Sequence, residues 1–216
     1  VVLYGSHARG DADKGSDVDV CAFCRQRGHV EQSEIAELLH TPLPRPLSVT
    51  GYSDNDFSAM LQYGSLFLWH LELEGRVLHG REYFARRMAE LRPFTRHGTE
   101  IEYHREIFND MFGVGVPRIP NEFDLALLFT IARNTCMVLA HKAGNPAFGR
   151  QTCFAATVEA YTGFPLEEAT YRELSEWKLV YERGLGKAVE LPSAADVVAI
   201  IHNIHDVLEY AHEHTA

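Results

Sequence analysis

Short apolar runs alternate with polar turns over the first eighty residues. Val1–Tyr4, a run that ends near Phe23, and Leu47–Tyr52 each have the length and pattern of a β-strand. Between the second and third runs, Glu31–His40 carries its apolar residues at helical spacing, which predicts a short amphipathic helix. The order of these segments predicts a strand, helix, strand unit.

Capping residues predict two helices and an edge strand after this unit. We expect Asp54 to cap a helix that runs to Leu61, and a second helix to begin at Ser65 and stop at Gly75. Val77–His79 is expected to return to the sheet as a short edge strand.

From residue 81 onward the apolar positions recur three and four residues apart, which is typical of packed helices. We therefore expect an α+β protein, with a small mixed sheet and flanking helices in residues 1–94 and an α-helical bundle in residues 95–216. The chain opens inside an apolar strand, so we expect further residues before Val1 in the full protein. The helical segments are Glu82–Leu91, Glu100–Phe112, Glu122–Lys142, Gln151–Tyr161, Leu166–Arg183 and Ser193–His212, separated by turns that include 113–117 and 184–186.

The composition narrows the classes of function. With 216 residues, 46% of them hydrophobic, the chain is long enough to bury a proper core. A net charge of −10 argues against a surface dedicated to nucleic acid, since phosphate backbones require clustered Lys and Arg. Cys21 and Cys24 form a CxxC, but on a strand they would point to opposite faces. With no disulfide spacing, secretory segment or long apolar span, we expect a reduced, cytoplasmic protein without membrane association.

The first twenty residues combine groups that suit a metal-bound nucleotide. Gly5 allows a sharp turn at the end of the first strand, and Gly5 and Ser6 offer N–H and hydroxyl donors to a phosphate. Asp17 and Asp19 lie two residues apart on an extended segment, so both carboxylates project from one face of a sheet. Two carboxylates held together repel unless a cation lies between them, and Mg²⁺ prefers carboxylate and phosphate oxygens. This stretch predicts a metal and nucleotide site.

Gly5-Ser6, then Ala8-Arg9-Gly10, then Asp17-x-Asp19 resembles the signature of the DNA polymerase beta nucleotidyltransferase superfamily. In layout the chain is similar to the minimal nucleotidyltransferases of bacteria. The resemblance implies that Gly5 and Ser6 bind a triphosphate and that Asp17 and Asp19 hold Mg²⁺ or Mn²⁺ and are the catalytic pair.

Two further residues are expected to contact the nucleotide. Ser16 directly precedes the Asp-x-Asp pair, and the guanidinium of Arg9, in the loop after Ser6, can reach phosphate oxygens. The alternative for Arg9 is a structural one, in which it tethers the loop to a backbone carbonyl or to Asp11 or Asp13.

The resembling families place a third carboxylate on the next strand, where it activates the acceptor hydroxyl. Here Leu47–Thr50 contains no acid. Three alternatives remain open. In the first, Asp54 or Asp56, just beyond the strand, swings in towards the metal. In the second, Glu72, Glu74 or a carboxylate of the helical domain supplies the base, as in kanamycin nucleotidyltransferase and its relatives. In the third alternative the protein binds nucleotide without turnover.

Polar residues interrupt the apolar helices of the second half. Arg133 lies in the most apolar segment, where a buried guanidinium needs an acid or a phosphate partner. We expect it to pair with Glu173 or Glu176, with a cleft that faces the nucleotide as the alternative. The HEPN domains that often accompany minimal nucleotidyltransferases carry an RNase motif that the spacing from Arg133 to His141 misses, so no nuclease activity is predicted. The residues assigned to the cleft are Arg133, Asn134, Arg150, Lys178 and Arg183.

The sequence therefore predicts an enzyme that moves a nucleoside monophosphate from an NTP, expected to be ATP, to an acceptor hydroxyl. The acceptor is a protein side chain, the 3′ end of a nucleic acid or a small molecule, and the acidic charge favours protein or a cationic small molecule. By resemblance we expect a toxin–antitoxin or phage-defence setting, with a protein partner or a homo-oligomer. The alternative is a nucleotide-binding regulatory protein, such as an antitoxin or a defence component, that has lost turnover and acts through a partner.

Overall fold

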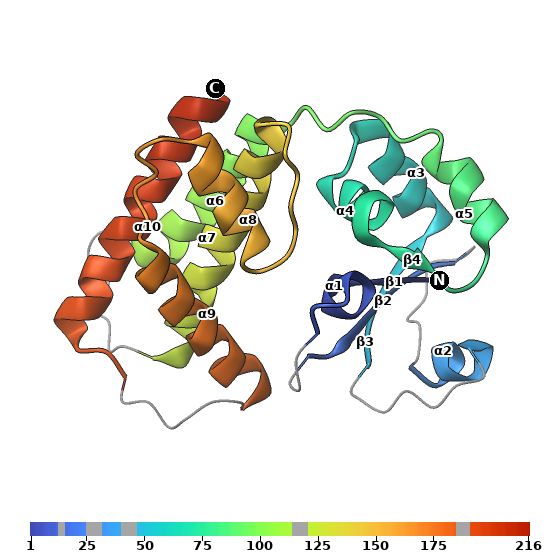
Figure 1. The fold of residues 1–216 in the computed structure, drawn as a ribbon, viewed down its shortest axis with the longest axis horizontal. Coiled ribbons are helices and arrows are strands. Elements are labelled where there is room, and N and C mark those ends of the chain that lie inside the picture. The colour runs from blue at the N-terminus through green and yellow to red at the C-terminus, as the bar shows by residue number, and fades with distance from the viewer. Residues whose placement is uncertain (13–15, 25–31, 40–46, 114–120, 185–190) are drawn as a thin grey trace. The chain divides into compact units, whose positions relative to one another are not determined.

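The computed structural model describes the chain apart from residues 13–15, 25–31, 40–46, 114–120 and 185–190. The chain divides into two compact units, Val1–Thr95 and Arg96–Ala216. The first contains a sheet and helices, and the described part of the second is helical (Figure 1). The fold is α+β, which confirms the predicted class. Most of each predicted turn at 113–117 and 184–186 lies outside the described residues.

Four strands form one mixed sheet in the first unit, in the order β3-β2-β1-β4. β1 pairs antiparallel with β2 and with β4, whereas β2 and β3 are parallel. Helix α2 connects the parallel pair, since parallel neighbours require a crossover. The strand, helix, strand prediction is confirmed, and the edge strand begins one residue earlier and is shorter than predicted. The bounds are β1 Val2–Tyr4, β2 Val18–Cys24, α2 Gln32–Leu39, β3 Leu47–Ser53 and β4 Arg76–Val77.

Alternation along β2 divides the first unit into two small cores. Cys21 packs with α3, α4 and α5, whereas Val20 and Cys24 pack with Ile35 of α2. Figure 1 shows the three helices on one side of the sheet and α2 on the other. Cys21 and Cys24 thus point to opposite faces, as predicted, and both are free thiols. The helix bounds are α3 Asp54–Tyr63, α4 Leu66–Glu74 and α5 Arg81–Met88.

The start of α3 is set by a capping box at the end of β3. The hydroxyl of Ser53 accepts a hydrogen bond from the backbone N of Asp56 at 3.1 Å, and the Asp56 carboxylate accepts one from the backbone N of Ser53 at 3.0 Å. The prediction that Asp54 caps this helix is wrong by one residue, because the reciprocal pairing satisfies both backbone donors. Asp54 instead accepts a hydrogen bond from the hydroxyl of Tyr83.

The second unit is a bundle built around one apolar helix, α7. Helices α6, α8, α9 and α10 all contact it, and its buried residues, such as Leu125, Leu128 and Ala132, form the centre of the core. A capping box between Ser193 and Asp196 begins α10, where the sequence predicts a helix start. The bounds are α6 His97–Phe112, α7 Glu122–Lys142, α8 Thr152–Ala160, α9 Glu168–Arg183 and α10 Ala194–Thr215.

Helix α7 corrects the expectation that the chain has no long apolar span. By length and composition alone it could cross a membrane. Its mean hydropathy over the most apolar window is 1.5, yet 67% of that window is buried inside the protein. Burial of this extent is the behaviour of a core helix, whose apolar surface is covered by its neighbours.

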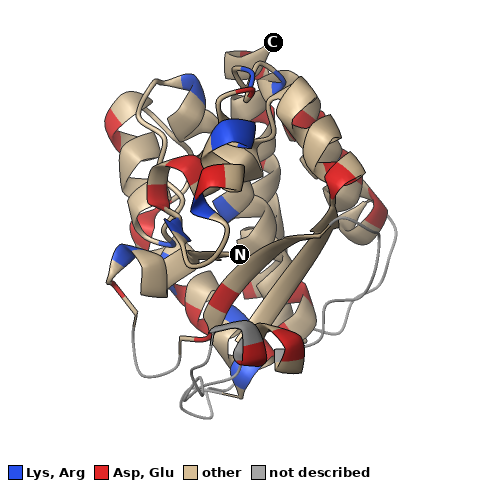
Figure 2. Ribbon diagram, turned by 90° about the vertical axis from the view of Figure 1, so that its right-hand side faces the viewer, with Lys and Arg blue, Asp and Glu red and all other residues tan. Residues whose placement is uncertain are grey.

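Acidic and basic residues are interspersed along the helices (Figure 2). Arg105 of α6, for example, pairs with Glu102 and with Glu209 of α10, each at 2.8 Å. Exposed pairs of this kind contribute little stability, but they neutralise basic side chains locally.

A buried histidine joins α6 to α7. His104 is 7% exposed, and its Nδ1 lies 3.2 Å from the hydroxyl of Thr135. Burial lowers the pKa of His104 from 6.5 to about 4, so the folded state binds fewer protons than the unfolded state between these values. The stability that depends on neutral His104 is therefore present above pH 6.5 and lost as the pH falls towards 4.

We predict that His104 accounts for a loss of about 3 kcal/mol in the stability of the second unit between pH 7 and pH 4. His104→Gln, which removes the titrating group, should flatten the pH dependence by about that amount, whereas His202→Gln on an exposed face of α10 should not. Amide hydrogen exchange of α6 and α7, measured from pH 7 to pH 4 in the whole chain, reports this difference. Equal pH dependence in the two variants would contradict the assignment.

Candidate functional site

The backbone of Gly5 lies directly against the carboxylate of Asp19. Antiparallel pairing of β1 with β2 sets Tyr4 opposite Asp19, and Gly5 follows with φ of +71°. A Cβ atom built on Gly5 would lie 2.4 Å from Oδ2 of Asp19, closer than two such atoms can approach. The left-handed conformation therefore favours glycine at this position, and a side chain here would force the carboxylate of Asp19 to shift.

Asp17 and Asp19 lie at the start of β2, close to this turn. Asp17 directly precedes the strand, and both side chains are half-buried. Residues two apart on an extended segment share a face, and Asp19 belongs to the face that carries Cys21. The start of β2 thus carries two carboxylates, and Gly5, at the start of the helix that follows β1, lies against one of them.

The segment after Gly5 is helical, which corrects the expectation of a loop. Gly5–Arg9 forms the short helix α1, and Gly10, with φ of +87°, ends it by donating a hydrogen bond from its N–H to the carbonyl of Ser6 at 2.9 Å. Arg9 is therefore the last residue of α1. His7 Nε2 lies 3.4 Å from the carbonyl oxygen of Ser16, so α1 also contacts the segment that leads into Asp17, where Ser16 is buried.

Arg9 joins α1 to α4 through Glu74. Its Nη1 donates to Oε2 of Glu74 at 3.0 Å, and its Nε donates to Asp11 at 3.1 Å. His70 Nε2 lies 3.1 Å from the same Glu74 oxygen. The structural alternative for Arg9 is thus present in part, with Asp11 and Glu74 as partners, while Asp13 lies outside the described residues.

This network keeps Glu74 charged. Burial raises the pKa of Glu74, but hydrogen bonds and charge from His70 and Arg9 outweigh burial, so the pKa of Glu74 lies below its ordinary value of 4.5. His70 also packs its ring edge against Tyr4, at 5.6 Å between centroids. The network therefore contacts both α1 and the residue paired with Asp19.

The structure brings no third carboxylate to Asp17 and Asp19 in the part of the chain it describes, where no three His, Cys, Asp or Glu side chains are grouped to hold a metal. On β3, Ser48 pairs in register with Asp19, and it carries a hydroxyl. Ser53 stands five residues further along β3 than Ser48, a separation of about 17 Å at 3.3 Å per residue, and Asp54 directly follows Ser53.

The other two acids named as third ligands lie on α4. Glu72 is exposed, and Glu74 is held by Arg9 and His70. Asp56, the remaining acid near β3, is occupied in the capping box with Ser53.

Two of the cleft residues of the second unit, Arg133 and Lys178, have partners within the bundle. Arg133 donates from Nη2 to the carbonyl of Phe148 at 2.7 Å, whereas Glu173 and Glu176 are exposed, so the expected acid partner is wrong. The carbonyl of Phe148 can serve as the partner of Arg133 because the segment that leads into α8 lies beside α7. Lys178 pairs with Glu182 at 2.8 Å on the surface of α9.

The remaining cleft residues are half-buried. The carbonyl of Arg150 accepts a hydrogen bond from the hydroxyl of Tyr171 at 2.6 Å, which ties the segment before α8 to α9. Asn134 follows Arg133 on α7, and Arg183 is the last residue of α9. These contacts fasten helices of one bundle to each other.

Sequence reasoning missed two contributors to the site, His70 and Tyr4. His70 and Glu74 stand four residues apart in a predicted helix, a spacing that places them on one face and could have indicated their pairing. Tyr4 shows no such signal, because only the strand register reveals that it lies opposite Asp19. Its hydroxyl lies 3.3 Å from that of Thr50, and burial raises the pKa of Tyr4 to about 12, with Asp19 adding to the effect.

Comparison with known proteins finds a similarity in the first part of the chain. Residues 1–41 match the family model described as a nucleotidyltransferase domain. A search of curated proteins and a search of solved structures each found no significant match. The matched segment contains Gly5, Ser6, Asp17 and Asp19, and within it the structure sets the backbone of Gly5 against the carboxylate of Asp19.

We predict that Gly5→Ala destabilises the first unit much more than Gly10→Ala. Both positions have positive φ, so each alanine costs about 1–2 kcal/mol in backbone strain, but only the Cβ at position 5 meets another atom within 4 Å. Urea unfolding of the two variants measures the difference. Equal destabilisation would show that the contact between Gly5 and Asp19 imposes no constraint.

We also predict that Glu74→Gln lowers stability by about 1–2 kcal/mol, because it weakens a half-buried pair with Arg9 and His70. The exposed Glu72→Gln, on the same helix, should change stability by less than about 0.5 kcal/mol. The lowered pKa of Glu74 means that its contribution is fully present above pH 4.5 and is lost as the pH falls further. Urea unfolding at pH 7 and pH 4 tests both statements, and a difference between the variants that grows at pH 4 would contradict them.

Proposed function

We propose that the protein transfers a nucleoside monophosphate from an NTP to an acceptor hydroxyl in a metal-dependent reaction, a proposal that the match of residues 1–41 to the nucleotidyltransferase domain model supports. The contact between Gly5 and Asp19 is the observation that carries this proposal. It sets potential phosphate donors beside a carboxylate within a segment that matches the family.

The roles of the site residues follow from their chemistry. Gly5 and Ser6 would hold the triphosphate through their N–H and hydroxyl groups, and Ser16 contributes at the edge of the same site. Arg9 keeps α1 attached to Glu74, and it would contact the phosphates only by releasing Asp11 or Glu74. In the transfer, the acceptor oxygen bonds to the α-phosphorus, the bond to the β-phosphate oxygen breaks, pyrophosphate leaves, and the hydroxyl proton passes to a base.

The donor set at the start of β2 fits a hard divalent cation. Asp17 and Asp19 offer carboxylate oxygens from adjacent positions, which suits Mg²⁺ or Mn²⁺ together with phosphate oxygens. When bound, the ion supplies neutralisation of the charge that develops on the phosphates. Asp17 and Asp19 would hold the ion, and its positive charge would offset the repulsion between the two carboxylates.

The base that accepts the hydroxyl proton comes from outside β3. Since Asp54 lies at the far end of the strand and Glu72 is exposed, the better source is the acceptor substrate, a partner or the helical unit. Glu74 serves this role only if it leaves Arg9 and His70, whose contacts favour its present position.

A second candidate function is nucleotide binding without turnover, in a regulatory protein that acts through a partner. The observation that favours it is the missing third carboxylate among the described residues. Both candidates fit a cytoplasmic protein that uses ATP, in a toxin–antitoxin or phage-defence setting and with a protein acceptor or partner.

We predict that the protein incubated with labelled NTP and Mg²⁺ or Mn²⁺ transfers label or releases pyrophosphate, and that Asp17→Ala and Asp19→Ala reduce the rate by at least about a hundredfold. The reason is that each variant removes half of the proposed metal ligands. Glu82→Ala, an exposed acid on α5 of the same unit, is the matched control and should retain activity.

The same assay separates the two candidate functions. Tight, metal-dependent NTP binding with no label transfer to any added protein, nucleic acid or small molecule would favour the regulatory function. NTP binding that survives unchanged in both Asp17→Ala and Asp19→Ala would show that the site lies elsewhere.

A further inference from the structure

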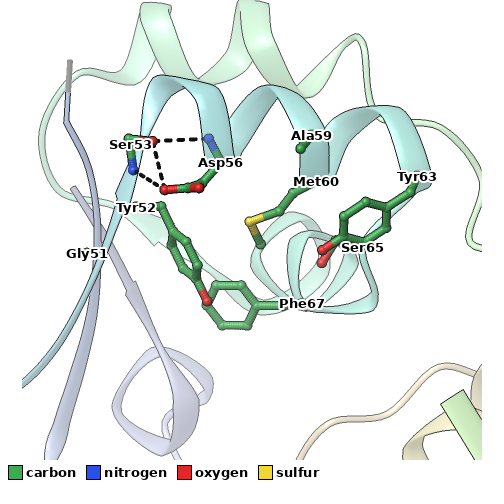
Figure 3. Close-up of a pocket in the computed structure, with 9 residues that line it drawn as sticks. All are labelled: Gly51, Tyr52, Ser53, Asp56, Ala59, Met60, Tyr63, Ser65 and Phe67. Carbon is green, nitrogen blue, oxygen red and sulfur yellow. Dashed lines mark hydrogen bonds between the residues drawn. The ribbon is translucent and has the colours of Figure 1, made fainter. Parts of the chain in front are cut away.

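An open hollow of ≈ 580 Å³ lies in the first unit beside the end of β3. Tyr52 of β3 and Phe67 of α4 form one wall, with their ring centroids 5.8 Å apart, and Met60 and Tyr63 of α3 approach from the other side (Figure 3). Tyr52 and Phe67 are half-buried, and Tyr63 is 41% exposed. Aromatic rings thus line a space that is open to a ligand.

The hollow lies on the face of the sheet that carries Asp19. Ser48 is the register partner of Asp19, and Tyr52 stands four residues further along the same strand, about 13 Å away at 3.3 Å per residue. One side chain connects the two places: the ring of Tyr4 lies 5.3 Å from that of Phe67, and Tyr4 pairs with Asp19 across β1 and β2. The separation suits one nucleotide with its phosphates near Asp19.

The lining determines what kind of group the hollow accepts. Among the residues that the structure describes, the lining includes tyrosine, phenylalanine and methionine side chains and the hydroxyls of Ser53 and Ser65, but no Lys or Arg. The carboxylate in this lining, Asp56, accepts hydrogen bonds from Ser53. A phosphate would meet that negative charge, whereas a flat uncharged ring can stack on Tyr52 and Phe67.

We propose that this hollow binds the nucleobase of the NTP, a ring that stacks on Tyr52 and Phe67 while the phosphates lie at Gly5 and Ser6. The inference rests on the proposed function, because that function places the phosphates. Stacking accepts any base, so the hollow contributes affinity for nucleotides over inorganic phosphates and little choice among the four bases.

The test compares two ways of closing the hollow. Ala59→Trp fills it from an exposed position on α3, and Ala85→Trp, at an exposed position on α5, is the matched control. Tyr52→Leu removes the flat ring, and Tyr52→Phe keeps it. The probes are ATP and inorganic tripolyphosphate, each with Mg²⁺, measured by calorimetry, and adenosine, measured by saturation-transfer NMR; thermal melting checks that each variant is folded.

We expect Ala59→Trp and Tyr52→Leu to weaken ATP binding about tenfold while tripolyphosphate binding stays the same, and both control variants to behave as wild type. Adenosine should bind wild type and Asp17→Ala but not Ala59→Trp. Equal loss of ATP and tripolyphosphate binding, or no loss of either, would overturn the proposal. Unchanged ATP affinity with a raised KM for an acceptor would also overturn it, by assigning the hollow to the acceptor.

The adenosine arm separates this inference from the proposed function. If wild type binds neither ATP nor tripolyphosphate but binds adenosine in a way that Ala59→Trp abolishes, the proposed function fails and the base site stands. If ATP binds through Asp17 and Asp19 but adenosine does not bind, the base site fails and the proposed function stands.

Discussion

The close approach of the Gly5 backbone to the carboxylate of Asp19 is the constraint on which the candidate site depends. It requires a residue without a side chain, a positive φ and an antiparallel register that sets Tyr4 opposite Asp19. Because these conditions are met together, the backbone of Gly5 lies beside the carboxylate of Asp19. The register of a strand of three residues therefore sets this approach.

The rest of the first unit supports this contact from two sides. Pairing with β2 holds β1 in register, and the network of Arg9, Glu74 and His70 fastens the helix after Gly5 to α4. Glu74 has a carboxylate that could bind a metal, but in the structure it pairs with Arg9 and His70. The edge strand β3 presents hydroxyls beside Asp19 instead of an acid, so the base for a transfer reaction has to come from outside the sheet.

The fold was predictable where one periodicity dominates. Strand alternation and helical spacing predict the mixed sheet and the bundle, since burial alone selects the apolar face of each element. The cap at Ser53 was missed because Asp54 is an equally good capping residue by type, and only the reciprocal pairing with Asp56 decides between them. Long-range partners could not be predicted, because no local pattern indicates that Arg133 donates to the carbonyl of Phe148 or that Arg9 pairs with Glu74.

The central claim is that Asp17 and Asp19 hold a divalent cation against the phosphates of a nucleotide lying at Gly5 and Ser6. The most direct measurement is a crystal structure with Mn²⁺ and a non-hydrolysable NTP, with data collected at the manganese absorption edge. The claim predicts an anomalous peak within bonding distance of the carboxylates of Asp17 and Asp19 and of a phosphate oxygen. A nucleotide bound elsewhere, or manganese that contacts neither carboxylate, would contradict it.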